Sequence, residues 1–187
     1  MSIYWNKEKR DGDIWKSKEQ RDRDEAWEWI YLCKELPYPF NHYQLPRLPG
    51  IYLVLGHLGP EHLNSYVTTK TGRRISIKEK LPLWISPDQR QQAFCHPLYI
   101  GTTHDLYERW TSHDHAEQIQ RLMNAGVKVQ FLLWVMPPSP NFRETEEEKN
   151  AREVREECLN KTLQPLLDFK RRRAICRRLW LFCRAAH

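Results

Sequence analysis

The chain has 187 residues, 40% of them hydrophobic, which is enough for one modest core with additional segments but thin for two full domains. The formal net charge is +6, and no apolar run approaches the ~20 residues that a membrane-spanning helix needs. The first residues, MSIYWNKEKRDGD, lack the apolar centre of a secretory signal. A soluble cytoplasmic protein with no membrane partner is therefore expected.

Cysteine usage agrees with a reducing compartment, because the number is odd and the spacing is scattered. No C-x-x-C pair occurs in the sequence, so a structural zinc site is not expected. The five thiols are Cys33, Cys95, Cys158, Cys176 and Cys183.

The positive charge is concentrated in a C-terminal tail. Residues 169–187 hold seven Lys/Arg and no acid against a chain total of +6, so the remainder carries −1. A short cationic tail suggests a polyanionic partner, through attraction to phosphates and release of their counterions. A solvated terminal helix is the alternative explanation.

In chain order, residues 1–47 are expected to form an N-terminal arm. Residues 26–36, AWEWIYLCKEL, predict a short amphipathic helix that ends before a proline-rich stretch. Residues 50–56, GIYLVLG, are bounded by glycines and predict a compact strand. Residues 57–96 are an insertion of net charge +3, in which YVTTKTGRRISI predicts a β-hairpin.

The remaining elements follow without a low-complexity linker. They are a strand at 97–101, helices at 105–112 and 116–126, a strand at 127–136 and a helix over 143–164 that Pro165 terminates. The first two strands have only the charged hairpin between them, which favours antiparallel pairing. The expected fold class is α+β, a small three-stranded antiparallel β-sheet flanked by helices.

Two tripeptides, Gly50-Ile51-Tyr52 and Tyr99-Ile100-Gly101, occupy the first two predicted strands. Because side chains alternate across a strand, both phenols can project from one face of an antiparallel pair. The glycines would then leave room for the backbone of a ligand to come close. Taken alone, each tyrosine is better explained by packing in the core.

A cation and an imidazole follow on the first helix of this region. Arg109 and His113 are four residues apart, so they share one helix face, and Asp105 with Glu108 forms a plausible N-terminal cap. The planar fork of an arginine suits the two free oxygens of a phosphodiester. An ordinary surface pair is the alternative.

The last predicted helix offers one partly buried carboxylate, Glu156. Leu159 and Leu163 follow it at three and seven positions, which places the buried stripe along its own face. One carboxylate with waters is a usual way to hold Mg²⁺. The acidic run that opens the helix is expected to face solvent and offset the helix dipole. It comprises Glu144, Glu146, Glu147 and Glu148.

Together these blocks resemble the GIY-YIG nuclease family over roughly residues 48–168. The resemblance rests on the paired tripeptides, on YIGTTHDLYERW with Arg109, and on EECLNKTLQPLLD with Glu156 nine residues before Pro165. Two departures stand out. Asp168 occupies a position where most members have asparagine, and the two tyrosines are 47 positions apart, whereas most members have a short connection.

The resemblance implies a DNA endonuclease that hydrolyses phosphodiester bonds with Mg²⁺ or Mn²⁺. Tyr52 would take the proton of the attacking water, Glu156 would hold the metal, and Arg109 would bind oxygens whose charge grows in the transition state. Tyr99 and His113 would position the phosphate or the nucleophile through hydrogen bonds. The supporting positions would be Gly50, Gly101 and Asp168.

DNA is the expected partner. Lys70, Arg73 and Arg74 of the inserted hairpin are candidates for gripping the duplex, although a decorative loop remains the alternative. The candidate contacts in the tail are Lys170, Arg171, Arg172 and Arg173. A stand-alone restriction-like or phage-type enzyme is favoured, with a homodimer possible for two-strand cutting. A module of the same fold that binds nucleic acid without catalysis is the alternative function, and a purely structural protein has little support.

Overall fold

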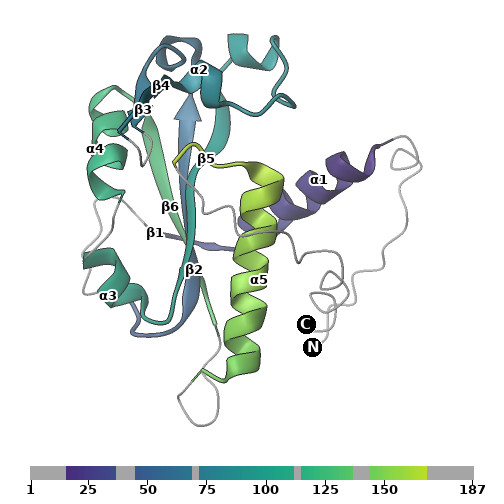
Figure 1. The fold of residues 1–187 in the computed structure, drawn as a ribbon, viewed down its shortest axis with the longest axis vertical. Helices are drawn as coiled ribbons and strands as arrows, with labels where there is room; N and C mark the ends of the chain where they lie inside the picture. Colours follow the sequence, from purple (N-terminus) through teal and green to yellow (C-terminus); the bar gives the residue numbers. More distant parts are fainter. Residues whose placement is uncertain (1–15, 37–44, 69–71, 112–114, 137–143, 168–187) are drawn as a thin grey trace.

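The computed structural model describes residues 16–36, 45–68, 72–111, 115–136 and 144–167. It has an α+β architecture in which helices lie on both faces of a small antiparallel sheet (Figure 1). The fold class expected from the sequence is thus confirmed at this level. No helix in these ranges is both long enough and apolar enough to cross a membrane.

The main sheet has four strands in the order β1-β6-β2-β5, rather than the three that were expected. The strands are β1 (Lys34–Leu36), β2 (Gly50–Leu58), β5 (Phe94–Thr103) and β6 (Lys128–Val135). The additional strand is β1, which pairs with Phe131–Leu133 and belongs to a segment predicted as helix. It is only three residues long, so no alternating pattern marked it in the sequence.

The segment expected as an N-terminal arm contributes to the same core. Helix α1 (Lys18–Tyr31) begins at Ser17, whose side chain accepts a hydrogen bond from the Gln20 amide, and it ends before β1. The predicted helix over 26–36 therefore extended too far, because residues 34–36 form β1. The buried residues of α1, Ala26 and Ile30, pack in one cluster with α5.

Strands β2 and β5 pair in antiparallel fashion, as predicted. Tyr52 lies opposite Gly101, and Gly50 lies opposite Thr103. Strand β2 also pairs with β6 along its other edge, and its alternate side chains enter two different core clusters, which explains why GIYLVLG is apolar on both faces. Strand β5 is left at the edge of the sheet.

The two faces of the sheet bury different helices. One face, with Tyr52 and Val54, packs against α3 (Leu106–Thr111) and α4 (Ala116–Asn124). The opposite face, with Ile51 and Leu53, packs against α1 and α5 (Glu146–Leu163). Figure 1 shows α3 and α4 on one side of the sheet and α1 and α5 on the other.

The insertion between β2 and β5 contains the predicted hairpin. Strands β3 (Tyr66–Thr68) and β4 (Arg74–Ser76) pair antiparallel, and Gly72 has the positive φ of 78° that such a turn favours. The hairpin is followed by the short helix α2 (Ile77–Lys80) and, before β5, by the 3-10 turn η4 (Gln89–Gln91). Another such turn, η3 (Pro60–His62), precedes the hairpin.

Helix α5 is fixed to the edge strand by a buried ion pair that the sequence did not indicate. Arg152 donates from Nε and Nη2 to the Glu144 carboxylate at 2.6 and 2.8 Å, and from Nη1 to Thr102 Oγ1 on β5. The Glu144 side chain is only 10% exposed. Its expected position on a solvated face was therefore wrong, because Arg152 draws it into the interior.

Candidate active site

The two tyrosines of the tripeptides lie side by side on one face of the sheet, as predicted. Their ring centroids are 5.7 Å apart and the planes differ by 29°. Tyr52 is buried and extends across the edge strand, so that its Oη would lie 2.7 Å from a Cβ atom placed on Gly101. A side chain at position 101 would displace this ring.

The glycines therefore serve a different purpose from the one expected. The space above Gly101 is filled by the rings of Tyr52 and Tyr99, and the space above Gly50 is filled by Leu106 and the Trp134 carbonyl. Neither glycine leaves a gap for the backbone of a ligand. Gly101 instead allows the Tyr52 ring to reach the sheet edge.

Arg109 joins this pair from helix α3. The start of the helix is fixed because the Glu108 amide donates to Asp105 Oδ1 at 2.9 Å, as the capping pattern predicted. Leu106 is buried and anchors the helix on the sheet. Arg109 Nε then donates to Tyr52 Oη at 3.0 Å. Three of the predicted site residues, drawn from three segments, thus meet in one cluster.

A fourth member, His115, was missed by sequence reasoning. It is 7% exposed, immediately precedes α4, and lies with its ring centroid 4.6 Å from that of Tyr99. The predicted imidazole, His113, lies outside the described residues. The sequence His113-Asp114-His115 offered two candidates, and the helical spacing from Arg109 selected only the first.

Burial dominates the electrostatics of Tyr52. Loss of solvent raises the pKa of this phenol well above its usual value, and the neighbouring Tyr99 raises it further. The hydrogen bond from Arg109 opposes these effects only in part. Tyr52 is therefore a neutral phenol at neutral pH in the ligand-free protein.

Glu156 is partly exposed on α5, across the sheet from Tyr52. Asn160, one turn later, is buried and donates from Nδ2 to Glu156 Oε1 at 3.3 Å. Among the described residues, no hydrogen-bond partner lies beside the buried Asn160 Oδ1. Two oxygen-bearing side chains, one of them missed by the sequence, therefore lie together on this helix.

The Glu156 carboxylate and the Tyr52 phenol approach the same short stretch of β5 from opposite faces. Arg152 contacts Thr102, whereas beyond the helix the amides of Leu166 and Leu167 donate to Pro97 and Leu98 at 3.1 and 2.7 Å. Helix α5 thus runs antiparallel to β5. One helical turn from Arg152 is about 5.4 Å, or roughly two strand residues, which brings Glu156 about level with Ile100, next to Gly101.

The donor set on α5 fits magnesium better than a transition metal. Within the described ranges, no group of three His, Cys, Asp or Glu side chains is placed to hold an ion. Mg²⁺ is usually bound by one or two carboxylates and keeps several waters. Glu156 and the Asn160 carbonyl oxygen offer hard ligands of this kind.

A basic hollow lies along α4. It encloses about 460 Å³ between this helix and the β3–β4 hairpin. Arg74 lies on one wall with its guanidinium 4.9 Å from the Tyr66 ring, and Arg121 lines the wall formed by α4. Arg73, the neighbour of Arg74, is also exposed. His115 immediately precedes the same helix, and the first residue of α4 that lines the hollow is Gln118.

Several predicted positions cannot be placed. Lys70 of the hairpin and Asp168 lie outside the described residues. The same holds for the candidate contacts of the tail, namely Lys170, Arg171, Arg172 and Arg173.

The chain matches no family model, no curated protein and no solved structure. The fold and the site therefore define a class only in structural terms. It is an α+β protein in which two tyrosines, an arginine and a histidine cluster on one face of an edge strand, with a carboxylate helix on the other.

Proposed function

We propose that the protein is a metal-dependent DNA endonuclease of the GIY-YIG type, a stand-alone enzyme of restriction-like or phage type. The observation that carries this proposal is the hydrogen bond from Arg109 Nε to Tyr52 Oη beside Tyr99. It joins two residues 57 positions apart, and the resemblance to the GIY-YIG nucleases gives both of them catalytic roles.

Arg109 is the residue that binds the scissile phosphate in this proposal. Its fork can contact two phosphodiester oxygens, whose charge grows in the transition state. Tyr52 orients this guanidinium through the hydrogen bond to its Oη and, as a neutral phenol, adds no negative charge beside it. Tyr99 and His115 line the same surface and position the phosphate or the attacking water.

Tyr52 is proposed to take the proton of the attacking water. It can do so only as the phenolate, so the phenol must first release its own proton to solvent; the hydrogen bond from Arg109 Nε–H favours this release against the burial that opposes it. When bound at Glu156 and Asn160, Mg²⁺ or Mn²⁺ would neutralise the phosphate and the departing 3′ oxygen. The substrate must therefore lie along the exposed edge of β5, where the two faces meet.

Backbone contacts to DNA are assigned to the basic hollow. Arg74 and Arg121 face it from opposite walls, and Arg73 extends the charge along the hairpin. Such contacts fix the register of the duplex without reading its sequence. They support the expectation that the insertion grips DNA.

The alternative function is a DNA-binding module of this fold that has lost catalysis. One observation favours it, since the carboxylate lies across the sheet from the phenol. The nuclease needs a metal ligand for cleavage, whereas the binding module needs none to hold DNA.

Glu156→Ala separates these functions. It should abolish cleavage of plasmid DNA in Mg²⁺ while changing the affinity for DNA less than about twofold, because a single carboxylate contributes little to phosphate contacts. Glu157→Ala is the matched control, since its side chain points about 100° away on the helix and should leave cleavage unchanged.

Cleavage is measured by gel and affinity by fluorescence anisotropy. If the wild-type chain cuts no plasmid, branched or single-stranded DNA in Mg²⁺ or Mn²⁺, the nuclease assignment fails. Binding to these DNAs without cutting would establish the alternative.

A further inference from the structure

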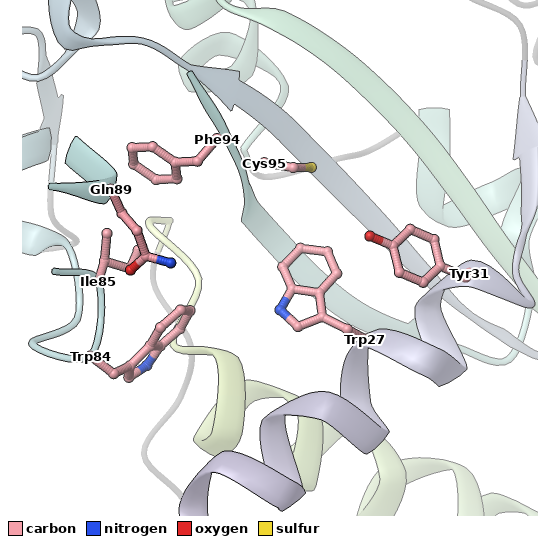
Figure 2. A pocket seen from close by; sticks show the side chains of 7 residues that line it. All are labelled: Trp27, Tyr31, Trp84, Ile85, Gln89, Phe94 and Cys95. Atoms are coloured by element: carbon pink, nitrogen blue, oxygen red, sulfur yellow. The ribbon is translucent and has the colours of Figure 1, made fainter. Parts of the chain in front are cut away.

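A second hollow, the aromatic pocket, lies between α1 and the insertion at the start of β5 (Figure 2). It encloses about 280 Å³, close to the lower limit of about 300 Å³ for small-ligand sites. Its aromatic walls are Trp27 and Tyr31 from α1, Trp84 from the insertion and Phe94 from β5. This volume suits one ring system rather than an extended ligand.

The wall formed by the insertion is braced by its own hydrogen bonds. Arg90 donates to the carbonyls of Ile85 and Pro82 at 3.1 and 3.4 Å, which closes the loop around Trp84. The Ser86 amide donates to Gln89 Oε1 at 2.9 Å, and the Gln89 amide donates to Ser86 Oγ at 3.2 Å. This wall of the pocket is therefore preformed.

The polar groups of the pocket are mainly donors. Since Gln89 Oε1 accepts from Ser86, the NH₂ group of Gln89 remains to donate, and Figure 2 shows it directed between the indoles of Trp27 and Trp84. In the part of the chain that the structure describes, Trp84 Nε1 is buried without a hydrogen-bond acceptor. A ligand that carries an acceptor on a flat ring would complement the NH₂ group of Gln89, which faces the pocket (Figure 2).

The charge around the pocket disfavours a cationic ligand. Its lining contains no carboxylate, and burial raises the pKa of the Cys95 thiol to about 11, so this group stays neutral. The guanidinium of Arg23 lies 5.1 Å from the Trp84 ring. An aromatic cage for an ammonium group would be weakened by this positive charge, whereas a phosphate beside the pocket would be attracted by it.

We propose that the aromatic pocket binds one unpaired nucleobase of the DNA substrate, stacked on the indoles and hydrogen-bonded to Gln89. The inference rests on the proposed function for the source of the base. Stacking on aromatic side chains is the usual way to hold unpaired bases, and it tolerates any base because each has a π face. The substrate would then be DNA with a bulge, flap or single-stranded segment.

The position of the pocket agrees with this role. Phe94 and Cys95 begin the strand that carries Tyr99 and Gly101. At about 3.3 Å per residue, six residues along β5 separate the pocket from the candidate active site by roughly 20 Å. One DNA molecule can span this distance.

The test uses the full-length chain in EDTA, where metal-dependent cleavage is blocked. The probe is a duplex with one bulged 2-aminopurine, compared with the same duplex fully paired. The bulged duplex should bind about tenfold more tightly, with quenching of the 2-aminopurine emission. Trp27→Leu and Trp84→Leu should remove both the preference and the quenching, and Gln89→Leu should reduce the preference.

Trp29→Leu is the matched control. Trp29 lies two residues from Trp27 on the same helix but packs against Trp134, with ring centroids 6.0 Å apart. It should leave the preference intact. If the tryptophan variants fail to fold, Tyr31→Ala replaces them, because this side chain is 79% exposed.

Equal affinity of the wild-type chain for bulged and paired duplex would overturn the inference. So would a preference that Trp27→Leu and Trp29→Leu reduce alike. A change in tryptophan fluorescence on addition of tetramethylammonium, with no effect of the bulge on affinity, would instead identify a cation cage. If the chain cuts DNA without preferring the bulge, the proposed function holds and the nucleobase pocket fails. If it prefers the bulge but never cuts, the pocket holds and the nuclease function fails.

Discussion

Two arginines approach the edge strand β5 from opposite faces of the sheet, and their partners differ. Arg152, on α5, is 4% exposed and directs two of its nitrogens to the Glu144 carboxylate. Arg109, on α3, donates to the neutral phenol of Tyr52. A carboxylate neutralises a guanidinium and fixes it, whereas a phenol orients it and itself adds no negative charge. The first arrangement stabilises the fold, and the second suits the binding of an anion.

The largest effect is expected from breaking the structural side of this comparison. Arg152→Ala should lower the free energy of unfolding by about 3–5 kcal/mol, because it leaves the Glu144 carboxylate buried without its partner. Urea denaturation followed by circular dichroism measures this change. The double variant Glu144→Leu/Arg152→Leu should recover part of the loss, and an equal or larger loss would show that the pair itself is net stabilising.

Arg109→Ala should act on the reaction instead. Removing a donor to the developing charge should reduce the rate of DNA cleavage about 10²–10³-fold. The free energy of unfolding should fall less than for Arg152→Ala, because this variant takes a donor from a neutral phenol rather than from a buried carboxylate. Arg109→Lys should restore little activity, because an ammonium lacks the planar fork. A loss of stability as large as that of Arg152→Ala would remove the distinction between the two arginines.

His96, also on β5, is a buried side chain whose protonation makes the stability of the fold depend on pH. Burial lowers its pKa to about 4, against an opposing contribution from the hydrogen bond to the Gln164 carbonyl. The folded protein therefore binds a proton less readily than the unfolded chain, whose histidine titrates near 6.5. The contribution of neutral His96 to the free energy of unfolding is fully present above that pH. It is lost as the pH falls, by about 3 kcal/mol near pH 4.

Urea midpoints at pH 7 and pH 4.5 measure this effect. His96→Gln keeps an amide donor for Gln164 and removes the titration, so its midpoint should fall less between the two pH values. Parallel decreases in the wild-type chain and in His96→Gln would assign the acid sensitivity to other groups.

The candidate site could be predicted only in part. The alternation of side chains along β2 and β5 placed Tyr52 and Tyr99 on one face, and the cap at Asp105 positioned the helix of Arg109. His115 and Asn160 were missed because each looks like an ordinary polar residue until the segment that it meets is known. The space over Gly101 was misjudged for the same reason, since the ring that fills it comes from another strand.

Local patterns in the sequence determined the α+β class, the hairpin of the insertion and the antiparallel pairing of β2 with β5. Strand and helix periods, turn glycines and caps act over a few residues, so they can be read without knowing the neighbours. Only the tertiary structure decided the fourth strand, the burial of Glu144 by Arg152 and the aromatic pocket. These features depend on which distant segments pack together, because the free energy of a buried charge or ring is set by its partners rather than by its position in the chain.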